Sequence, residues 1–167
     1  QQLIEKYTDL SQSFFLELFG DPVSNPMGWE NQQLTKVIDS IENGWSPVCD
    51  KEKRKNESEW GVLKLSSVSY TIYNPEENKR LPEKLLPRNN IEVKNGDLLI
   101  SRKNTYKLVG ACAYVFSTKK RLMLPDTIFR LNYNSEKCNP IFLWFLFSLV
   151  HVPGTTVDLI ITTLLFS

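Results

Sequence analysis

The sequence predicts an α+β domain in which a mixed, mostly antiparallel β-sheet lies between two terminal helices. Residues 2–19 carry apolar side chains at helical spacing, and residues 141–150 form a strongly apolar run directly after Pro140. Several short stretches between them alternate apolar and polar residues, as half-buried strands do. Strands of mixed length with a helix at each end are typical of the α+β class. The 167 residues suffice for one domain with its own core.

The N-terminal helix carries a seam of apolar residues at alternating spacings of four and three. This spacing is typical of a coiled coil, although an amphipathic helix that lies on its own domain explains it equally well. Gly20 and Pro22 end the helix. Gln1 already lies inside the helical pattern, so we expect no signal peptide and a chain that is a fragment of a longer one. The seam consists of Leu3, Tyr7, Leu10, Phe14 and Leu18.

The next part of the chain alternates between turns and short regular segments. Pro, Gly and Asn make residues 20–34 a connector with tight turns. A short segment over residues 34–41 leads into a long polar loop over residues 42–59. Residues 60–70 alternate as a strand would, whereas residues 71–90 are rich in turn residues and irregular.

Three further strands and the second helix complete the predicted domain. Residues 91–101, which include the Asn-Gly turn signal at 95–96, and residues 108–116 are predicted to pair as neighbouring strands. A strand over residues 127–133 precedes the helix at 141–150, which is too short to cross a bilayer and is therefore predicted to be buried in the core. The domain boundaries that follow are residues 1–20, 21–150 and 151–167, the last being an apolar tail that ends abruptly, as in a truncated product.

Charge is segregated along the chain, although the formal net charge is only +1. Residues 1–50 contain eight acidic and two basic residues, whereas residues 98–125 contain six basic residues and no acidic residue. This pattern indicates a local positive field. The three cysteines are far apart and fit neither a disulfide framework nor zinc-ligand spacing, so we expect reduced cysteines in a cytoplasmic protein.

The basic residues of two loops are candidates for contact with DNA. Arg can hold the O6 and N7 atoms of guanine together, and Asn can do the same for N6 and N7 of adenine, so Arg102 and Asn104 are predicted to contact bases. Lys and Thr suit phosphate oxygens, which set the register without reading sequence. Solvated loop tips are the alternative explanation for both clusters. The predicted contacts are Trp45, Ser46, Lys51, Lys53, Arg54, Ser66, Ser67, Tyr70, Arg102, Lys103, Asn104, Thr105, Lys107, Lys119 and Lys120.

A metal-dependent nuclease is the enzymatic alternative. Nucleases of the restriction class hold a divalent metal with one acidic residue followed by a Glu-x-Lys tripeptide. Glu92–Lys94 and Glu77–Lys79 match that tripeptide, and Asp97 or Asp126 could supply the other carboxylate. The tripeptide is common by chance, and the sequence contains neither a Gly-rich phosphate loop nor a methyl-donor signature. The residues therefore favour a non-catalytic protein, with a stand-alone Mg-dependent endonuclease as the alternative.

Taken together, five motifs resemble the specificity subunit of type I restriction-modification systems. They are 14-FFLELFGDPVSNPMGW-29, 43-NGWSP-47, 63-LKLSSV-68, 96-GDLLISRKNT-105 and 109-VGACAYV-115, in the order that the family has them. The resemblance covers about residues 2–150 and corresponds to one target recognition domain with the end of a conserved spacer helix. The tail after residue 150 departs from the family pattern.

The resemblance implies sequence-specific binding to double-stranded DNA, one domain reading half of a bipartite target. It implies no chemistry and no cofactor in this chain. S-adenosylmethionine, ATP and Mg²⁺ would be bound by partner modification (methyltransferase) and restriction subunits. It also places residues 44–47 next to DNA and gives Gly96 and Asp97 a structural role in a turn. Sequence alone leaves open an inert assembly fragment in which the N-terminal helix pairs with another chain.

Overall fold

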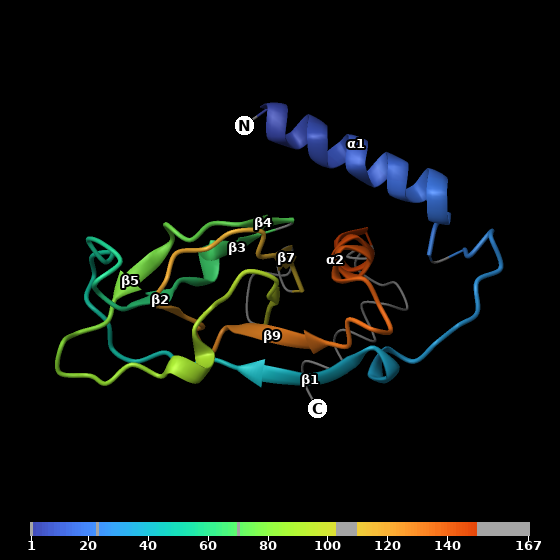
Figure 1. Cartoon of the computed structure of the whole chain (residues 1–167). Helices are drawn as coiled ribbons and strands as arrows, with labels where there is room; N and C mark the ends of the chain where they lie inside the picture. The colour runs from blue at the N-terminus through green and yellow to red at the C-terminus, as the bar shows by residue number, and fades with distance from the viewer. Residues whose placement is uncertain (1, 23, 70, 103–109, 150–167) are drawn as a thin grey trace.

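A computed structural model describes residues 2–22, 24–69, 71–102 and 110–149 (Figure 1). Within these residues the fold is α+β, as predicted. The helices are α1 (Gln2–Phe19) and α2 (Pro140–Leu149), and the short 3₁₀ turns are η1 (Leu34–Lys36), η2 (Leu65–Ser67) and η3 (Asn89–Ile91). The strands are β1 (Ile38–Asn43), β2 (Gly61–Leu63), β3 (Val68–Ser69), β4 (Ile72–Tyr73), β5 (Asn78–Arg80), β6 (Leu98–Ser101), β7 (Cys112–Tyr114), β8 (Leu122–Met123) and β9 (Ile128–Tyr133).

The described strands form three sheets. The largest has the order β1-β9-β6-β7, and all of its pairs are antiparallel. The second has the order β5-β2-β8, in which β2 and β8 are parallel, and β3 and β4 form a two-stranded ribbon. The predicted pairing of the strands on either side of the basic loop is confirmed, because Leu98 lies opposite Tyr114 and Ile100 lies opposite Cys112.

The four-stranded sheet separates two hydrophobic clusters. Alternation along its strands sends Leu99, Ala113 and Ile128 to the cluster shared with the smaller sheets. Their neighbours Leu98 and Phe129 join the cluster on the other face, which includes Leu143 and Phe147 of α2 and further residues of the sheet. The predicted apolar helix is therefore observed as the core helix α2, as its length predicted. None of the helices in the described part of the chain is long and apolar enough to span a membrane.

Three predicted strands are shorter than expected. In the described part of the predicted strand 108–116, only Cys112–Tyr114 form β7. In the predicted strand 60–70, the 3₁₀ turn η2 at residues 65–67 interrupts the alternation. It divides this segment into β2 and β3. The segment 91–101 begins in a 3₁₀ turn and a Gly96 turn with positive φ, so only its last four residues form β6. The strands β1, β4, β5 and β8 were not predicted, and each of the last three has only two or three residues.

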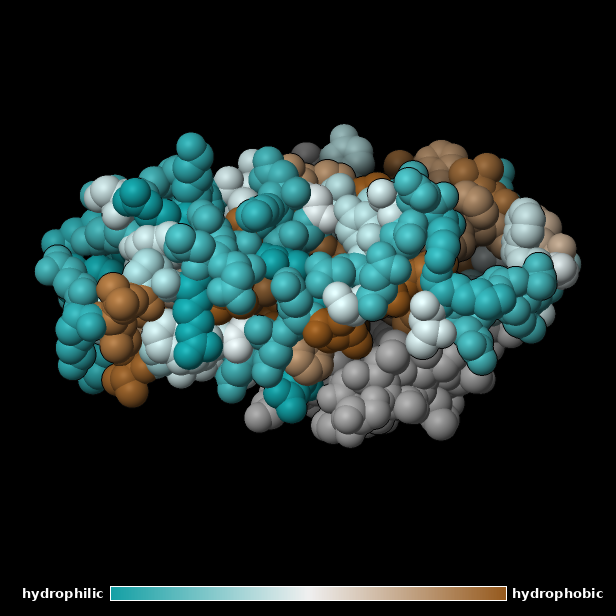
Figure 2. Space-filling view, turned by 60° about the horizontal axis from the view of Figure 1, so that its bottom comes forward, coloured by the Kyte–Doolittle hydropathy of each residue, from teal (hydrophilic) through white to brown (hydrophobic). Residues whose placement is uncertain are grey.

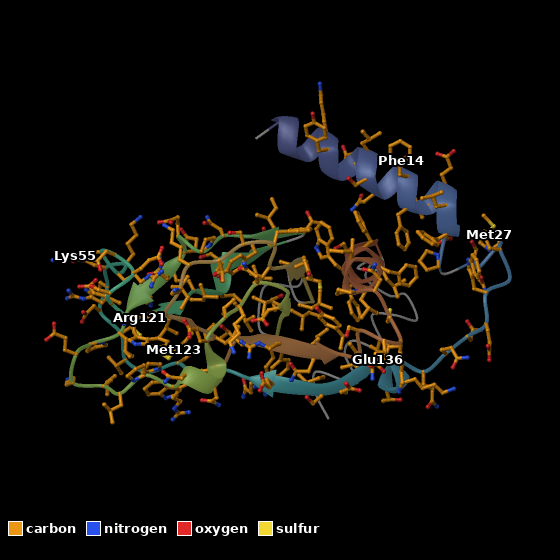
Figure 3. All side chains as sticks on the ribbon, viewed as in Figure 1. Phe14, Met27, Lys55, Arg121, Met123 and Glu136 are labelled. Atoms are coloured by element: carbon orange, nitrogen blue, oxygen red, sulfur yellow. The ribbon has the colours of Figure 1, made fainter. Side chains whose placement is uncertain are left out.

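The apolar seam of α1 faces away from the domain. Tyr7, Leu10, Phe14 and Leu18 are between 50% and 66% exposed, and Figure 3 shows Phe14 on the side of α1 opposite α2. The helix instead contacts α2 through Phe15 and Phe19, whose ring centroids lie 5.3 Å from that of Phe142. The seam was explained either by a coiled coil or by a helix that lies on its own domain. Because these four side chains are exposed, the second explanation does not apply to them.

A buried arginine on β9 joins four segments of the chain. The guanidinium of Arg130 donates to the Asp97 carboxylate at 3.0 Å and to the Glu42 carboxylate at 2.8 Å. It also donates to the main-chain oxygens of Asn90 and Glu92. The Asp97 carboxylate also accepts the amide N–H of Lys94, which closes the turn before β6 and confirms the structural role predicted for Asp97. Burial raises the pKa of Asp97, although Arg130 and the Lys94 amide lower it.

We expect Asp97→Asn to lower the free energy of unfolding by about 3 kcal/mol, because it leaves a buried guanidinium without its most buried counter-charge. Chemical denaturation measures this loss. Glu42→Gln is the matched control: the Glu42 side chain is 39% exposed, so the same loss of charge should cost less than about 1 kcal/mol. Equal losses for the two variants would contradict the role assigned to the buried pair.

Candidate nucleic-acid interface

The loop after β1 is held tightly against the segment that precedes β9. A Cβ atom on Gly44 would lie 2.2 Å from the main-chain oxygen of Pro125 and 2.3 Å from that of Leu124, so only glycine fits. The next residue, Trp45, donates its amide N–H to the Leu124 oxygen at 2.9 Å. The hydroxyl of Ser46 donates to the Asp126 carboxylate at 2.5 Å and accepts the Asp126 amide at 3.0 Å. Residues 44–46 and 124–126 therefore form one rigid surface at this end of the sheet.

The guanidinium groups of two arginines lie over aromatic rings at this end of the sheet. The guanidinium carbon of Arg102 lies 5.1 Å from the centroid of Phe129, and its amide donates to the Thr127 oxygen at 2.9 Å. The guanidinium carbon of Arg88 lies 4.3 Å from the centroid of the Trp45 ring. Arg88 was not among the predicted contacts. It lies in the turn-rich segment 71–90, and neither adjacent residue is basic, so it does not belong to a basic cluster in the sequence.

Among the described residues, two of the predicted lysine contacts are paired with the same acidic residue. Lys53 and Lys119 both bind the Glu76 carboxylate, and this places two loops that are distant in sequence side by side. These two lysines lower the pKa of Glu76 to about 2, so Glu76 is charged at neutral pH. Lys51 and Lys120 are exposed. Figure 3 places Lys55 and Arg121 of the same region at the end of the molecule opposite α1.

Two predicted contacts are wrong, because their side chains are buried and do not reach the surface. Arg54 is 5% exposed, and its guanidinium donates to the main-chain oxygens of Glu59, Lys120 and Arg121. Ser67 is 0% exposed. Because the Arg54 side chain is buried, the loop 51–55 presents less positive charge to a partner than its sequence suggests.

The other predicted contacts divide into exposed residues and residues outside the described chain. Ser66 is exposed, and its hydroxyl donates to the Glu77 carboxylate at 2.6 Å. Trp45 is half-buried against the core cluster on its face of the sheet, so its ring supports Arg88 as well as lining the loop. The predicted contacts Tyr70, Lys103, Asn104, Thr105 and Lys107 lie outside the described residues.

The carboxylates proposed for a nuclease do not converge. Asp97 is bonded to Arg130, and Asp126 is bonded to Ser46. Glu92 accepts the amide N–H of Arg121, and Glu77 binds Lys64 and Ser66. In the part of the chain that the structure describes, no three His, Cys, Asp or Glu residues lie close enough to share a metal ion.

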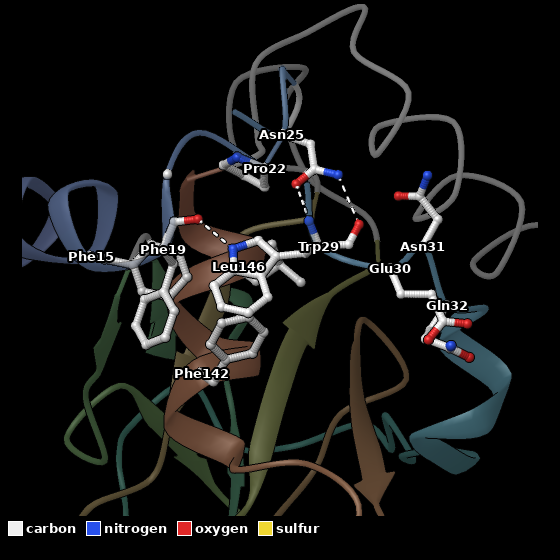
Figure 4. Close-up of a pocket in the computed structure, with 11 residues that line it drawn as sticks. Phe15, Phe19, Pro22, Asn25, Trp29, Glu30, Asn31, Gln32, Phe142 and Leu146 are labelled. Atoms are coloured by element: carbon white, nitrogen blue, oxygen red, sulfur yellow. Dashed lines mark hydrogen bonds between the residues drawn. The ribbon is translucent and has the colours of Figure 1, made fainter. Parts of the chain in front are cut away.

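A separate apolar groove of about 450 Å³ lies between α1 and the connector that follows it (Figure 4). Phe15 and Phe19 line it on the α1 side, and Phe142 and Leu146 line it on the α2 side. The Asn25 side chain bonds both the amide and the carbonyl of Trp29, whose indole donates to the Phe19 oxygen at 2.9 Å. In Figure 2 the visible face is mostly hydrophilic, and hydrophobic side chains gather toward the end where α1 and α2 lie.

The fold and this surface define an α+β domain with a rigid loop surface bearing two stacked arginines. No family model matches the chain. The chain is, however, 39% identical over 115 residues to the type I restriction enzyme EcoEI specificity subunit of Escherichia coli. This alignment covers 69% of the chain and 19% of that subunit, so the chain corresponds to about a fifth of the relative's length. The resemblance to type I specificity subunits is confirmed, and the match is consistent with a single target recognition domain.

We expect Gly44→Ala to destabilise the domain by about 2 kcal/mol, because the added methyl overlaps main-chain oxygens that cannot move without breaking the Trp45 hydrogen bond. Thermal and urea unfolding measure the effect. Gly28→Asn is the control: its φ is +69°, which Asn tolerates, and nothing lies within 4 Å of an added Cβ. A Gly44→Ala protein as stable as the control would contradict the tight apposition of the two loops.

Proposed function

We propose that this chain recognises a short sequence in double-stranded DNA, as a non-catalytic target recognition domain of a type I restriction-modification system. The homology to an EcoEI specificity subunit over 115 residues is the observation that carries this proposal. The geometry adds Arg102, which is attached to a rigid sheet end and stacked on Phe129. A stacked guanidinium keeps its N–H edge free for the O6 and N7 atoms of a guanine.

Within the same proposal, lysines near the smaller sheets contact phosphates. Lys51 and Lys120 are exposed, and Lys53 and Lys119 have side chains that are 61% and 47% exposed. Such contacts position the protein on the duplex and read no bases. Lys103, Thr105 and Lys107 extend this set on the grounds given by the sequence alone, with Asn104 as a further base contact.

The proposed partners are those of a type I assembly. DNA would be read as one half of a bipartite site, and modification and restriction subunits would supply methylation and cleavage. S-adenosylmethionine, ATP and Mg²⁺ would then bind to those partners. The exposed seam of α1 supports pairing of this helix with another helix, because four large side chains on one stripe remain uncovered by the domain. Cytoplasmic location belongs to the same proposal.

We expect Arg102→Ala to weaken binding to a preferred duplex by about 1–3 kcal/mol and to relax preference at one base pair. The duplex is obtained by selection from a random pool, and fluorescence anisotropy then measures affinity for it and for its single-base variants. Lys120→Ala should instead weaken binding to every duplex and reduce the salt slope by about one. Equal losses on all sequences for Arg102→Ala would contradict its role as a base contact.

We expect Glu76→Gln to tighten binding to every duplex, because it releases Lys53 and Lys119 from a carboxylate that competes with phosphate. The plot of the logarithm of the affinity against the logarithm of the salt concentration should then be steeper, with a slope more negative by up to about two. Glu57→Gln is the matched control, since Glu57 is exposed nearby, lines the same small pocket and forms no ion pair with either lysine. An unchanged salt slope for Glu76→Gln would show that these two lysines do not contact phosphates.

A further inference from the structure

We infer that Arg88 is a second base-reading residue, held by Trp45 so that its guanidinium meets the edge of a guanine at a base pair different from the one that Arg102 contacts. This inference rests on the proposed DNA recognition and adds a residue that neither the motifs nor the predicted basic loops contain. The basis for this inference is a comparison of the partners of the six described arginine side chains.

Four of these arginines are occupied inside the protein. Arg130 binds Asp97 and Glu42, and Arg80 binds Asp50 and Glu59. The guanidinium of Arg54 donates to main-chain oxygens, and so does that of Arg121. Arg88 and Arg102 differ from all four, because each guanidinium lies over a ring and, within the described residues, neither donates to an acceptor or forms an ion pair. Their N–H groups are therefore available to an acceptor from outside the chain.

The position of Arg88 is fixed from both its backbone and its side chain. Its amide N–H donates to the sulfur of Met123 at 3.2 Å, and the residues after it form η3. Its guanidinium lies on the Trp45 ring, which packs against the core. A guanidinium carbon 4.3 Å from a ring centroid is close enough for the flat face of the group to contact the ring. In that arrangement the planar edge, which recognises guanine bidentately, would face away from the ring. A side chain fixed in this way loses less conformational entropy on binding.

The place of Arg88 in the fold separates it from Arg102. Trp45 packs against the cluster on one face of the four-stranded sheet, whereas Phe129 belongs to the cluster on the other face. The two arginines therefore flank the segment 124–127, to which Trp45 and Arg102 are both hydrogen-bonded. Neighbouring bases on one strand are only about 3.4 Å apart, so residues on the two sides of this segment reach different base pairs.

The test uses the full chain and the duplex selected from a random pool, with every single-base variant of that duplex. Arg88→Ala should reduce discrimination at one base pair by roughly tenfold, at a position where Arg102→Ala leaves discrimination intact. Arg88→Lys should not restore it, since a lysine keeps the charge but lacks the planar fork. Lys84→Ala is the matched control: it removes one exposed positive charge four residues away, and should leave the order of preference among duplexes unchanged.

Three results would overturn the inference. Uniform loss of affinity across all duplexes for Arg88→Ala would make Arg88 a phosphate contact. Full discrimination by Arg88→Lys would show that the planar guanidinium is not required. If Arg88→Ala lost discrimination at the same base pair as Arg102→Ala, Arg88 would not read a second base pair. Failure of the proposed function looks different, because the unaltered chain would then show no preference among duplexes before any variant is measured.

Discussion

The rest of this structure depends on the hydrogen bonds and ion pairs of one buried group, the guanidinium of Arg130. It lies on the central strand β9 and binds carboxylates from β1 and from the turn before β6. It also binds the oxygens of Asn90 and Glu92, at the end of the η3 turn that follows Arg88. A buried charge without partners is costly, so these four segments must come together for the sheet to form. The loop that carries Arg88 is thus positioned by the same contact that orders the sheet.

The electrostatics of the surface favour selective over general binding. The chain is nearly neutral, and Glu76 holds two of the lysines nearest the smaller sheets. Exposed ion pairs contribute little to folding, so this arrangement is better understood by its effect on partners. In the proposed complex it would lower attraction to phosphate irrespective of sequence and leave base contacts to decide affinity. Arginines supported by aromatic rings would suit that task, because their side chains are already positioned in the free protein.

Sequence predicted the elements whose signals are local. The helices α1 and α2 and the pairing of β6 with β7 followed from periodicity and turn residues, and β9 matched its predicted range to within one residue. Two- and three-residue strands such as β4 and β8 carry too few positions for a pattern. The burial of Arg54, the pairing of Lys53 with Glu76 and the stacking of Arg88 on Trp45 join residues between 5 and 67 positions apart. Such contacts depend on the assembled fold, which composition and spacing do not contain.

The most direct test of this account is a map of the DNA-contacting surface by NMR, in which the amide and arginine side-chain signals of the labelled chain are followed while a selected duplex is added. The account predicts that the largest changes fall on residues 44–46, 124–127 and the guanidinium groups of Arg88 and Arg102, with α1 and its groove beside α2 unchanged. Changes confined to α1 and α2, with both guanidinium signals unmoved, would contradict it.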